Sequence, residues 1–579
     1  MSGDDDRTPE APTEPTAGDG SPATGDGSPA TSGSAAKRAR RRRAPERLPL
    51  ALASLLSLLS GGLYVLAVPP FDLAPLGWFG LVPLLLALEG ASYRRVFWCS
   101  WLVGLATNLG GFPWITELLV NFGGLPTPVA VLLHGLMGAY QALMFPAAAL
   151  AATWLRRSKV PFAAAWVGGF LLSDFLFPMI FPWYLAMGQY RLLPVVQIAD
   201  VVGVVGVTAL LVAFNAALYQ LLTVAAERLP RRPAWLPPAG THSRRAAARA
   251  GAAAAALVVA ALAYGVVQQW RYEARRAGAE RVPFGLVQPN IGIREKRDTL
   301  LAHDHLQKLQ RLTADVERRG AMVAVWPESA YPGGLPREPA RGMDELRDHP
   351  ERHPLRIRKG FDLPLVFGSI TRGTDPPRRY NSAFLLDTEG RLQGPVDKNV
   401  LLVFGEYIPL RDWLSFLDRW FPRAGSLAAG TQPGVLRLGN LRLGILNCYE
   451  DILPAYVGRM MRAAQPHVLV NITNDAWFGR SAEPYQHLAL AIFRCVEQRR
   501  EMVRAVNTGV SAHVAATGEI LAETRIFEEA APVVEVVPYG GRTIYGRVGD
   551  VPGYLGLGGL VAWAVAFRLR RRARQSCVR

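Results

Sequence analysis

The stretch Leu441-Arg442-Leu443-Gly444-Ile445-Leu446-Asn447-Cys448-Tyr449-Glu450 places a thiol directly after an apolar run. The run 441–446 is typical of a buried strand, and α/β folds place their chemistry in loops at strand ends. Cys448 is therefore a candidate nucleophile. A cysteine between apolar residues is by itself more often a small buried hydrophobe, so the case for chemistry depends on partner residues elsewhere in the chain.

Further strand and helix patterns surround this stretch between residues 269 and 550. Amphipathic spacing predicts helices over 300–319 and 484–501. Together these patterns predict an α/β domain of about 270 residues with its own core. Apolar or alternating runs predict its strands at 282–288, 322–326, 363–370, 383–386, 441–447 and 468–473.

Long apolar segments flank this domain on both sides. The chain has 579 residues, half of them hydrophobic, and a formal net charge of +17. The first apolar segment has no small-residue cleavage site after it, so we expect a retained helix and not a signal peptide. Membrane-spanning helices are predicted at 48–68, 73–88, 96–112, 128–155, 161–181, 198–225, 252–267 and 551–567.

The basic residues orient these spans. Clusters at 37–43, 94–95, 156–159, 228–249 and 568–574 fall on one side of the membrane if the spans alternate. The positive-inside rule then places both termini in the cytoplasm and the α/β domain outside the inner membrane. These clusters lie beside apolar spans and do not line a helix face with aromatic residues, which argues against a nucleic-acid binder.

Four parts follow from this organisation. Residues 1–44, rich in Gly, Pro, Ser, Thr, Asp and Ala, form a predicted disordered tail with a basic end. We expect residues 45–268 to form a seven-helix transmembrane domain, 269–550 the outer α/β domain, and 551–579 an eighth span with a basic tail.

The cysteines exclude two kinds of site. Cys99, Cys448, Cys495 and Cys577 form no CxxC pair and no cluster with histidine, so we expect neither a metal centre nor a disulfide framework. No cofactor is expected either. Cys495 is predicted to be a core residue, while His487 is either a structural histidine or a contact to a lipid headgroup.

Charged residues follow two of the other predicted strands. Glu328 comes after the run 322–326, and Lys398 comes after the run 383–386. A lone charged residue in a loop is usually a solvated surface group. Together with Cys448, however, these residues resemble the Glu-Lys-Cys triad of the nitrilase superfamily, in the motifs Trp326-Pro327-Glu328, Lys398, Phe404-Gly405-Glu406-Tyr407-Ile408-Pro409-Leu410, Cys448-Tyr449-Glu450 and Asn474-Asp475-Ala476-Trp477-Phe478-Gly479.

A nitrilase-like domain between a seventh and an eighth span resembles one branch, the apolipoprotein N-acyltransferase family. The resemblance implies an α-β-β-α sandwich behind a multi-span helical domain. It also implies transfer of a fatty acyl chain from a phospholipid, which we expect to be phosphatidylethanolamine, to the α-amine of the N-terminal S-diacylglyceryl cysteine of a lipoprotein. The reaction would pass through a thioester on Cys448 in a ping-pong sequence.

The same resemblance assigns roles to the residues around the triad. Glu328 would be the general base, and Lys398 would stabilise anions near the thiol. Glu406 would orient the lysine, while Tyr449 and Glu450 would support the nucleophile and the amine site. Asn381 is either a positioning residue or a turn-capping asparagine.

Aromatic residues suggest where a lipid enters. The bulky apolar residues from 410 to 421, including Trp413 and Trp420, predict a mobile lid that faces the bilayer, although a core helix has the same pattern. Trp477 is a further candidate contact to substrate. Trp183 is either an interfacial belt residue or part of an entry for lipid.

Several features depart from the family pattern or leave alternatives open. A tryptophan is common where this chain has Arg297, and Asn399 and Val403 stand where His and Pro are common. Asp174 and Asp200, within or beside spans, have either a packing or interface role or a functional one. A membrane-tethered amidase that hydrolyses C–N bonds, or a scaffold in which Cys448 is inert, are the alternative functions.

Overall fold

A computed structural model describes residues 48–576 apart from 122, 234, 294, 340–344, 374–377, 404 and 409–424, and apart from the side chains of Arg297 and Ser576. The predicted tail at 1–44, the predicted lid with Trp413 and Trp420, and Cys577 lie outside the described residues.

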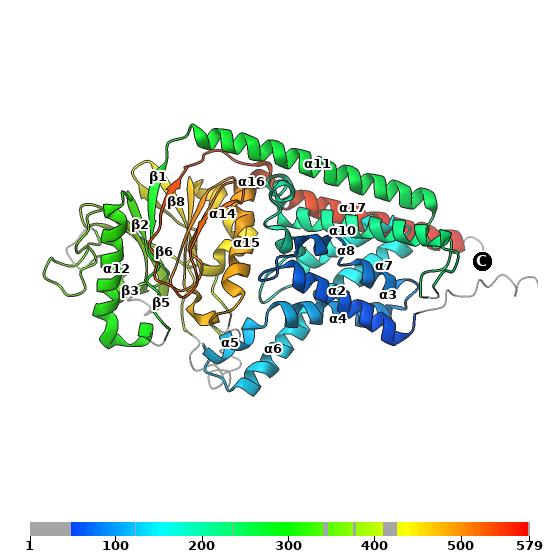
Figure 1. Cartoon of the computed structure of the whole chain (residues 1–579), viewed down its shortest axis with the longest axis horizontal. Helices are drawn as coiled ribbons and strands as arrows, with labels where there is room; N and C mark the ends of the chain where they lie inside the picture. The colour runs from blue at the N-terminus through cyan, green and yellow to red at the C-terminus, as the bar shows by residue number, and fades with distance from the viewer. Residues whose placement is uncertain are drawn as a thin grey trace, which may run out of the picture. The chain divides into compact units, whose positions relative to one another are not determined.

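Helices make up the first part of the chain and its C-terminal end (Figure 1). They pack around a shared apolar core that includes Trp114, Phe145, Trp166 and Phe170. Their bounds are α2 (Leu50–Ala67), η1 (Ala74–Trp78), α3 (Val82–Leu88), α4 (Tyr93–Gly111), α5 (Trp114–Asn121), α6 (Thr127–Gln141), α7 (Met144–Arg157), α8 (Phe162–Leu176), η2 (Leu185–Gln189), α9 (Leu193–Val196), α10 (Ala199–Ala225), η3 (Ala226–Arg228), α11 (Arg244–Ala277) and α17 (Val551–Ser576).

Five of these helical stretches are long and apolar enough to cross a bilayer by length and composition, and two shorter apolar ones accompany them. They coincide with seven of the eight predicted spans. The remaining prediction, 96–112, corresponds to α4, whose first turn carries Arg94 and Arg95. Helix α11 continues past residue 268 to Ala277, so the predicted domain boundary at 268 falls inside a helix.

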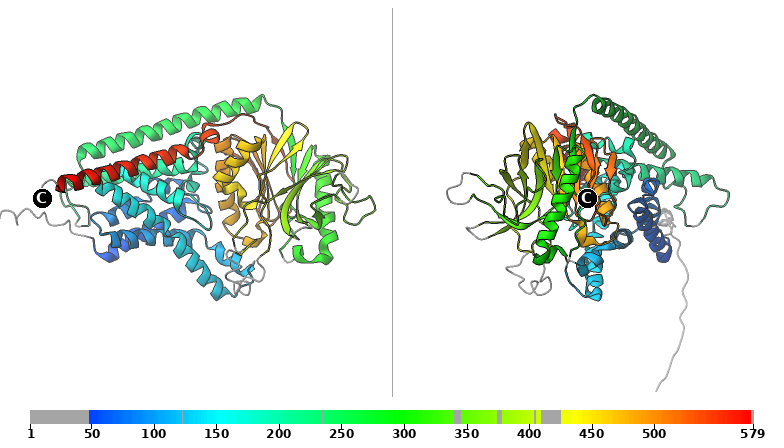
Figure 2. Two further views of the ribbon diagram at one scale, coloured as in Figure 1. Left: turned by 180° about the vertical axis from the view of Figure 1, so that it is seen from behind. Right: turned by 60° about the vertical axis from the view of Figure 1, so that its left-hand side comes forward.

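The α/β part contains two sheets stacked face to face (Figures 1 and 2). The first sheet has the order β13-β1-β2-β4-β5-β6, with β3 beside β4, and the second has the order β12-β11-β10-β9-β8-β7. The strands are β1 (Val282–Leu286), β2 (Val323–Val325), β3 (Tyr331–Pro336), β4 (Leu365–Arg372), β5 (Arg379–Leu386), β6 (Leu392–Asp397), β7 (Val435–Leu438), β8 (Leu441–Asn447), β9 (Val468–Thr473), β10 (Met502–Val506), β11 (Ala512–Val514), β12 (Ile520–Glu523) and β13 (Val533–Val536).

Side chains alternate between the two faces of each strand, so each sheet has an apolar face, and the two apolar faces stack on each other. Side chains of one face, such as Phe284 and Val325 in the first sheet and Ile445 and Val470 in the second, form a single buried cluster between the sheets. At one end, the Gln288 side-chain oxygen accepts hydrogen bonds from the hydroxyls of Ser511 and Thr524, both at 2.7 Å, and so ties the two sheets together.

Helices cover the outer faces and complete the predicted α-β-β-α sandwich. Helix α12 (Ala302–Arg318) packs its apolar face, with Leu306, Leu309 and Val316, on the first sheet. Helices α14 (Pro454–Ala464) and α15 (Glu483–Gln498) cover the second sheet. The short helix α16 (Ile544–Val548) leads into α17, and η4 (Glu295–Arg297), η5 (Thr299–Leu301), η6 (Cys448–Ile452) and η7 (Asp475–Phe478) complete the elements.

Helix α15 lies between the second sheet and the apolar helices of the first part of the chain, here called the membrane-type helices. This position explains why nearly all its residues are buried. Its Gln486 side chain bonds to Trp114 Nε1 at 2.9 Å and to the backbone carbonyl of Gly111 at 2.8 Å. Just after the helix, Arg499 forms a buried ion pair with Asp200 at 2.7 Å. Asp200 therefore has the interface role that the sequence left open; the described residues give Asp174 no comparable ion pair.

Candidate active site

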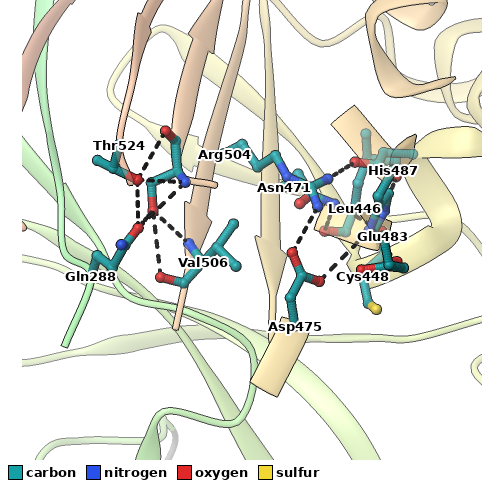
Figure 3. A network of polar contacts seen from close by, with 12 residues as sticks. Gln288, Leu446, Cys448, Asn471, Asp475, Glu483, His487, Arg504, Val506 and Thr524 are labelled. Atoms are coloured by element: carbon teal, nitrogen blue, oxygen red, sulfur yellow. Dashed lines mark hydrogen bonds and ion pairs between the residues drawn. The ribbon is translucent and has the colours of Figure 1, made fainter. Parts of the chain in front are cut away.

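Cys448 lies where β8 meets η6, with a backbone φ of +53°, which is unusual for a residue with a side chain. The side-chain amide of Asn471, on the neighbouring strand β9, donates to the Cys448 carbonyl at 2.8 Å. Figure 3 shows the sulfur on the side of the turn away from His487 and Arg504. A sharp turn held in this way presents the thiol at the strand end, as the sequence predicts.

The predicted triad residues come from three strand ends and meet in one buried site. The ammonium of Lys398, just after β6, lies 3.1 Å from Glu328 Oε1 and 2.9 Å from Glu406 Oε1. The Asn381 amide on β5 donates to Glu328 Oε1 at 2.6 Å and to Glu406 Oε1 at 3.3 Å. Asn381 thus contacts both carboxylates from within strand β5, so the alternative of a turn-capping asparagine is wrong.

The charges of this site favour a neutral thiol beside a charged lysine. Burial would lower the pKa of Lys398, but Glu328 and Glu406 outweigh it and hold this pKa well above its usual value. Burial raises the pKa of the Cys448 thiol well above its usual value, and the charge of Glu328 adds to this effect, while Lys398 opposes it. These directions fit a neutral thiol, and Glu328 is the carboxylate that interacts electrostatically with both Cys448 and Lys398.

Glu450 links the turn at Cys448, here called the nucleophile turn, to residues 398–401, here called the lysine loop. One carboxylate oxygen accepts from the backbone N–H groups of Asn399 at 2.7 Å and Val400 at 3.0 Å, and the other accepts from the N–H of Asn447 at 3.0 Å. Burial raises the pKa of Glu450 to about 7, although these three bonds favour the carboxylate. Glu450 therefore supports the site through the backbone on both sides of it.

Tyr449 contacts the lysine loop, and Asn399, which departs from the family pattern, belongs to it. The Tyr449 hydroxyl donates to the backbone carbonyl of Leu401 at 2.9 Å, and the Lys398 ammonium lies 5.7 Å from the centre of the Tyr449 ring. The Asn399 amide donates to the carbonyl of Asp397 at 2.8 Å and to the Tyr456 hydroxyl at 3.1 Å. The Asn399 amide thus bonds both to the backbone beside Lys398 and to helix α14.

A buried charge network lies behind the nucleophile turn (Figure 3). His487 Nε2 lies 2.8 Å from Asp451 Oδ1, and the Arg504 guanidinium lies 2.5 Å from Asp451 Oδ2 and 3.5 Å from Asp475 Oδ2. Burial and Arg504 oppose protonation, but Asp451 and Asp475 raise the pKa of His487 to about 9. His487 is therefore a structural, charged histidine, which is one of the two roles that the sequence left open.

The same network includes three side chains with metal-ligating atoms. Atoms of Asp475, Glu483 and His487 lie within 4.8 Å of one another. A metal ion needs a neutral imidazole, whereas His487 lies beside Asp451 with a raised pKa, and the Arg504 cation occupies the same network. The arrangement fits a charge network better than a metal centre.

The predicted aromatic contacts differ in position. Trp477 on η7 is half-buried and lines a cavity beside the triad. Trp183 is only 2% exposed and packs on Phe112 and Phe145 with ring centres 5.7 and 6.3 Å apart. An interfacial belt role is wrong for Trp183, because the helices close around its ring; a role in an entry for lipid stays a prediction.

Three polar residues of the site were not predicted from the sequence: Asn471, Asp451 and Arg504. Asn471 and Arg504 are polar residues within fully buried strands, β9 and β10. A polar side chain in such a strand needs a buried partner. The polar residues within these apolar strands could therefore have been recognised in the sequence. Cys495 is fully buried, as predicted.

Two family models match successive parts of the chain. Residues 60–217 match the family model of the apolipoprotein N-acyltransferase N-terminal domain, and residues 285–539 match that of the carbon-nitrogen hydrolases. Among solved structures, an amidase of the nitrilase superfamily from Nesterenkonia AN1 is 18% identical, covering 45% of this chain and 92% of its own, with a TM-score of 0.32.

Full-length relatives carry the assignment. The apolipoprotein N-acyltransferase of Geobacter metallireducens is 35% identical over 89% of this chain and 95% of its own length. That of Azotobacter vinelandii is 31% identical over 90% of this chain and 96% of its own length. Two family models in the expected order and relatives that match almost end to end lead to one conclusion: the chain belongs to the apolipoprotein N-acyltransferase family.

Proposed function

We propose that this chain transfers a fatty acyl chain from a phospholipid to the α-amine of the N-terminal S-diacylglyceryl cysteine of bacterial lipoproteins. Membership of the family supports this activity. The observation that carries the mechanism is the buried ammonium of Lys398, which contacts Glu328 and Glu406 and interacts electrostatically with the Cys448 thiol.

In the first half-reaction Glu328 removes the proton of the Cys448 thiol, and the sulfur attacks an ester carbonyl of the phospholipid. The carbon–oxygen bond of the ester breaks, and the departing lysophospholipid alcohol takes the proton from Glu328. The acyl chain remains on Cys448 as a thioester. Such a step divides one difficult transfer into two easier ones.

In the second half-reaction the α-amine of the acceptor attacks the thioester. Glu328 accepts a proton from the attacking nitrogen, an amide bond forms, and the Cys448 sulfur leaves as the thiolate and regains a proton. The two half-reactions give ping-pong kinetics, because the lysophospholipid leaves before the acceptor reacts.

Both half-reactions pass through a tetrahedral oxyanion. Its donors are the Lys398 ammonium and the backbone N–H of Tyr449, and one such donor typically contributes about 10²–10³-fold to the rate. Glu406 and Asn381 hold the lysine and the base in place by their bonds to Lys398 and Glu328. Because the triad is buried, few water molecules compete with the amine for the thioester.

We further propose that the chain lies in the bacterial inner membrane, with both termini in the cytoplasm and the α/β domain outside. The basic clusters and the apolar helices support this orientation. Phosphatidylethanolamine is the proposed acyl donor. The segment with Trp413 and Trp420 is proposed to form a lid that faces the bilayer.

A direct test is to incubate the purified protein with phosphatidylethanolamine and measure its intact mass, with Cys448→Ala as the control. We expect a fatty-acyl increment that hydroxylamine removes and that is absent from the variant. Addition of a diacylglyceryl peptide with a free amine should then discharge it. An unmodified protein with intact phospholipid would contradict the proposal and favour an amidase or an inert scaffold.

A further inference from the structure

A cavity of about 790 Å³ lies beside Glu328. Its walls include Pro327 and Ser329, which flank Glu328, together with strand β3. Asn474 and Trp477 close it from the second sheet. The cavity therefore borders the site at which an acyl ester would react, and it is large enough for the polar part of a substrate.

The charged side chains that line the cavity are basic. Lys296, Arg372 and Arg379 are among the lining residues, with His305 beside them, and no Asp or Glu is among the described lining residues. Nearby, Arg337 is neutralised by a two-bond ion pair with Asp397. By contrast, the described part of the chain gives neither Arg372 nor Arg379 a carboxylate partner. The cavity is thus suited to an anion.

Lys296 connects this cavity to the proposed base. Its ammonium donates to the backbone carbonyl of Glu328 at 2.9 Å and to the Ser329 hydroxyl at 3.1 Å. The described residues leave its third N–H free for a ligand. Burial lowers the pKa of Lys296 to about 8, so an anion in the cavity would stabilise its charged form.

We propose that this cavity binds the phosphate group of the acyl donor, with Arg372, Arg379 and Lys296 as its ligands. This inference rests on the proposed function. The phosphodiester distinguishes the donor from the acceptor, whose diacylglyceryl group carries no charge. In a phospholipid only the glycerol unit separates the phosphate from the ester carbonyls, so a phosphate held beside Glu328 directs an ester toward Cys448. Apolar lining residues such as Ile291 and Leu335 would contact that glycerol unit.

The test compares two donors on the full-length protein. The double variant Arg372→Gln/Arg379→Gln and the parent are given either phosphatidylethanolamine or a neutral p-nitrophenyl ester of the same fatty acid, and thioester formation on Cys448 is followed by intact mass. We expect a loss of about tenfold with the phospholipid, since the cation–phosphate contacts of two exposed arginines are removed, and a change of less than about twofold with the neutral ester. Arg318→Gln/Arg352→Gln, which removes the same charge from exposed sites outside the cavity, is the matched control.

An inorganic phosphate series separates a headgroup site from a site for free phosphate. At constant ionic strength, phosphate should slow the phospholipid reaction of the parent, leave its neutral-ester reaction unchanged, and have less effect on the double variant. Equal inhibition of both donors would identify a separate phosphate effector site and overturn the assignment. An equal loss on both donors in the double variant, or no loss, would also overturn it. If the parent forms no thioester from either donor, the proposed function itself fails.

Discussion

Replacing Glu450 by Gln tests how the backbone around the triad is held. The carboxylate accepts hydrogen bonds from the N–H groups of Asn399, Val400 and Asn447. Glutamine keeps one acceptor oxygen, which can hold Asn399 and Val400 next to Lys398, but its NH₂ group then faces the Asn447 N–H. One charge-assisted bond is lost, and two donors meet at the nucleophile turn.

The cost can be estimated from that lost bond. A hydrogen bond to a charged group contributes about 1.5–3 kcal/mol. If the whole cost appears in the transition state, because Cys448 and Lys398 are no longer held at their reacting distance, thioester formation slows by about 10- to 160-fold. The affinity for phospholipid should change little, because Glu450 is fully buried and is not among the residues that line the cavity.

The pH dependence gives a second readout. As the pH falls through about 7, the Glu450 carboxyl takes up a proton, and one acceptor oxygen becomes a donor. The parent should therefore lose rate below about pH 7, and Glu450→Gln should lack this step because it has no proton to gain there. Single-turnover acylation measured by intact mass between pH 5.5 and 8.5 covers the range, with the exposed Glu389→Gln as the control.

A wild-type acylation rate in Glu450→Gln would refute this reasoning. So would an unchanged acidic limb, since the proton would then be taken up elsewhere. A variant that unfolds would show a lower thermal midpoint and lost helix signal. A folded variant with slow acylation at all pH values is the expected result.

Three further substitutions test the surroundings of the triad. Asp200→Asn removes the partner of the buried Arg499 guanidinium, so the detergent-solubilised protein should lose about 3–5 kcal/mol of stability and unfold at a lower temperature. An unchanged midpoint would mean that the pair does not hold the helices to the α/β part. His487→Gln removes one of the two cations beside Asp451, and should lower the thermal midpoint and slow alkylation of Cys448 by iodoacetamide. If both stay at parent values, the network has no influence on the thiol. Asn381→Ala deletes the 2.6 Å bond to the proposed base and should slow single-turnover acylation by about tenfold. Wild-type kinetics in that variant would leave the asparagine with no positioning role.

Strand prediction succeeded where the apolar pattern is continuous. The runs 441–447 and 468–473 coincide with β8 and β9, and the helix predicted at 300–319 coincides with α12 to within two residues. Of the proposed triad, Glu328 and Cys448 come shortly after such runs, whereas Lys398 follows β6, a strand that the sequence did not predict, and was identified by the resemblance alone. The sequence missed short strands such as β11, whose three residues show no period of their own. These strands form because a neighbouring strand offers backbone partners.

The contacts that support the proposed triad were harder to predict from the sequence, because they join residues that are close in space but far apart in the chain. Glu450 was identified by resemblance, but its bonds to the lysine loop connect residues some 50 positions apart. Arg504 bridges Asp451 and Asp475 from a third strand, and no spacing in the sequence relates the three. Burial of Trp183 likewise follows from the packing of separate helices, which the sequence around this residue does not reveal.

Helix α15 relates the chemistry to the membrane. On one side His487 and Glu483 belong to the charge network behind the Cys448 turn. On the other side Gln486 bonds to Trp114 and to backbone carbonyls of the membrane-type helices, and Glu497 accepts from the backbone N–H of Val204. If those helices shifted, α15 would move with them, and so would the charge network behind the Cys448 turn. The same helix thus fixes the thiol relative to the helices that would hold lipid, which a transferase with two lipid substrates requires and a hydrolase of soluble amides does not.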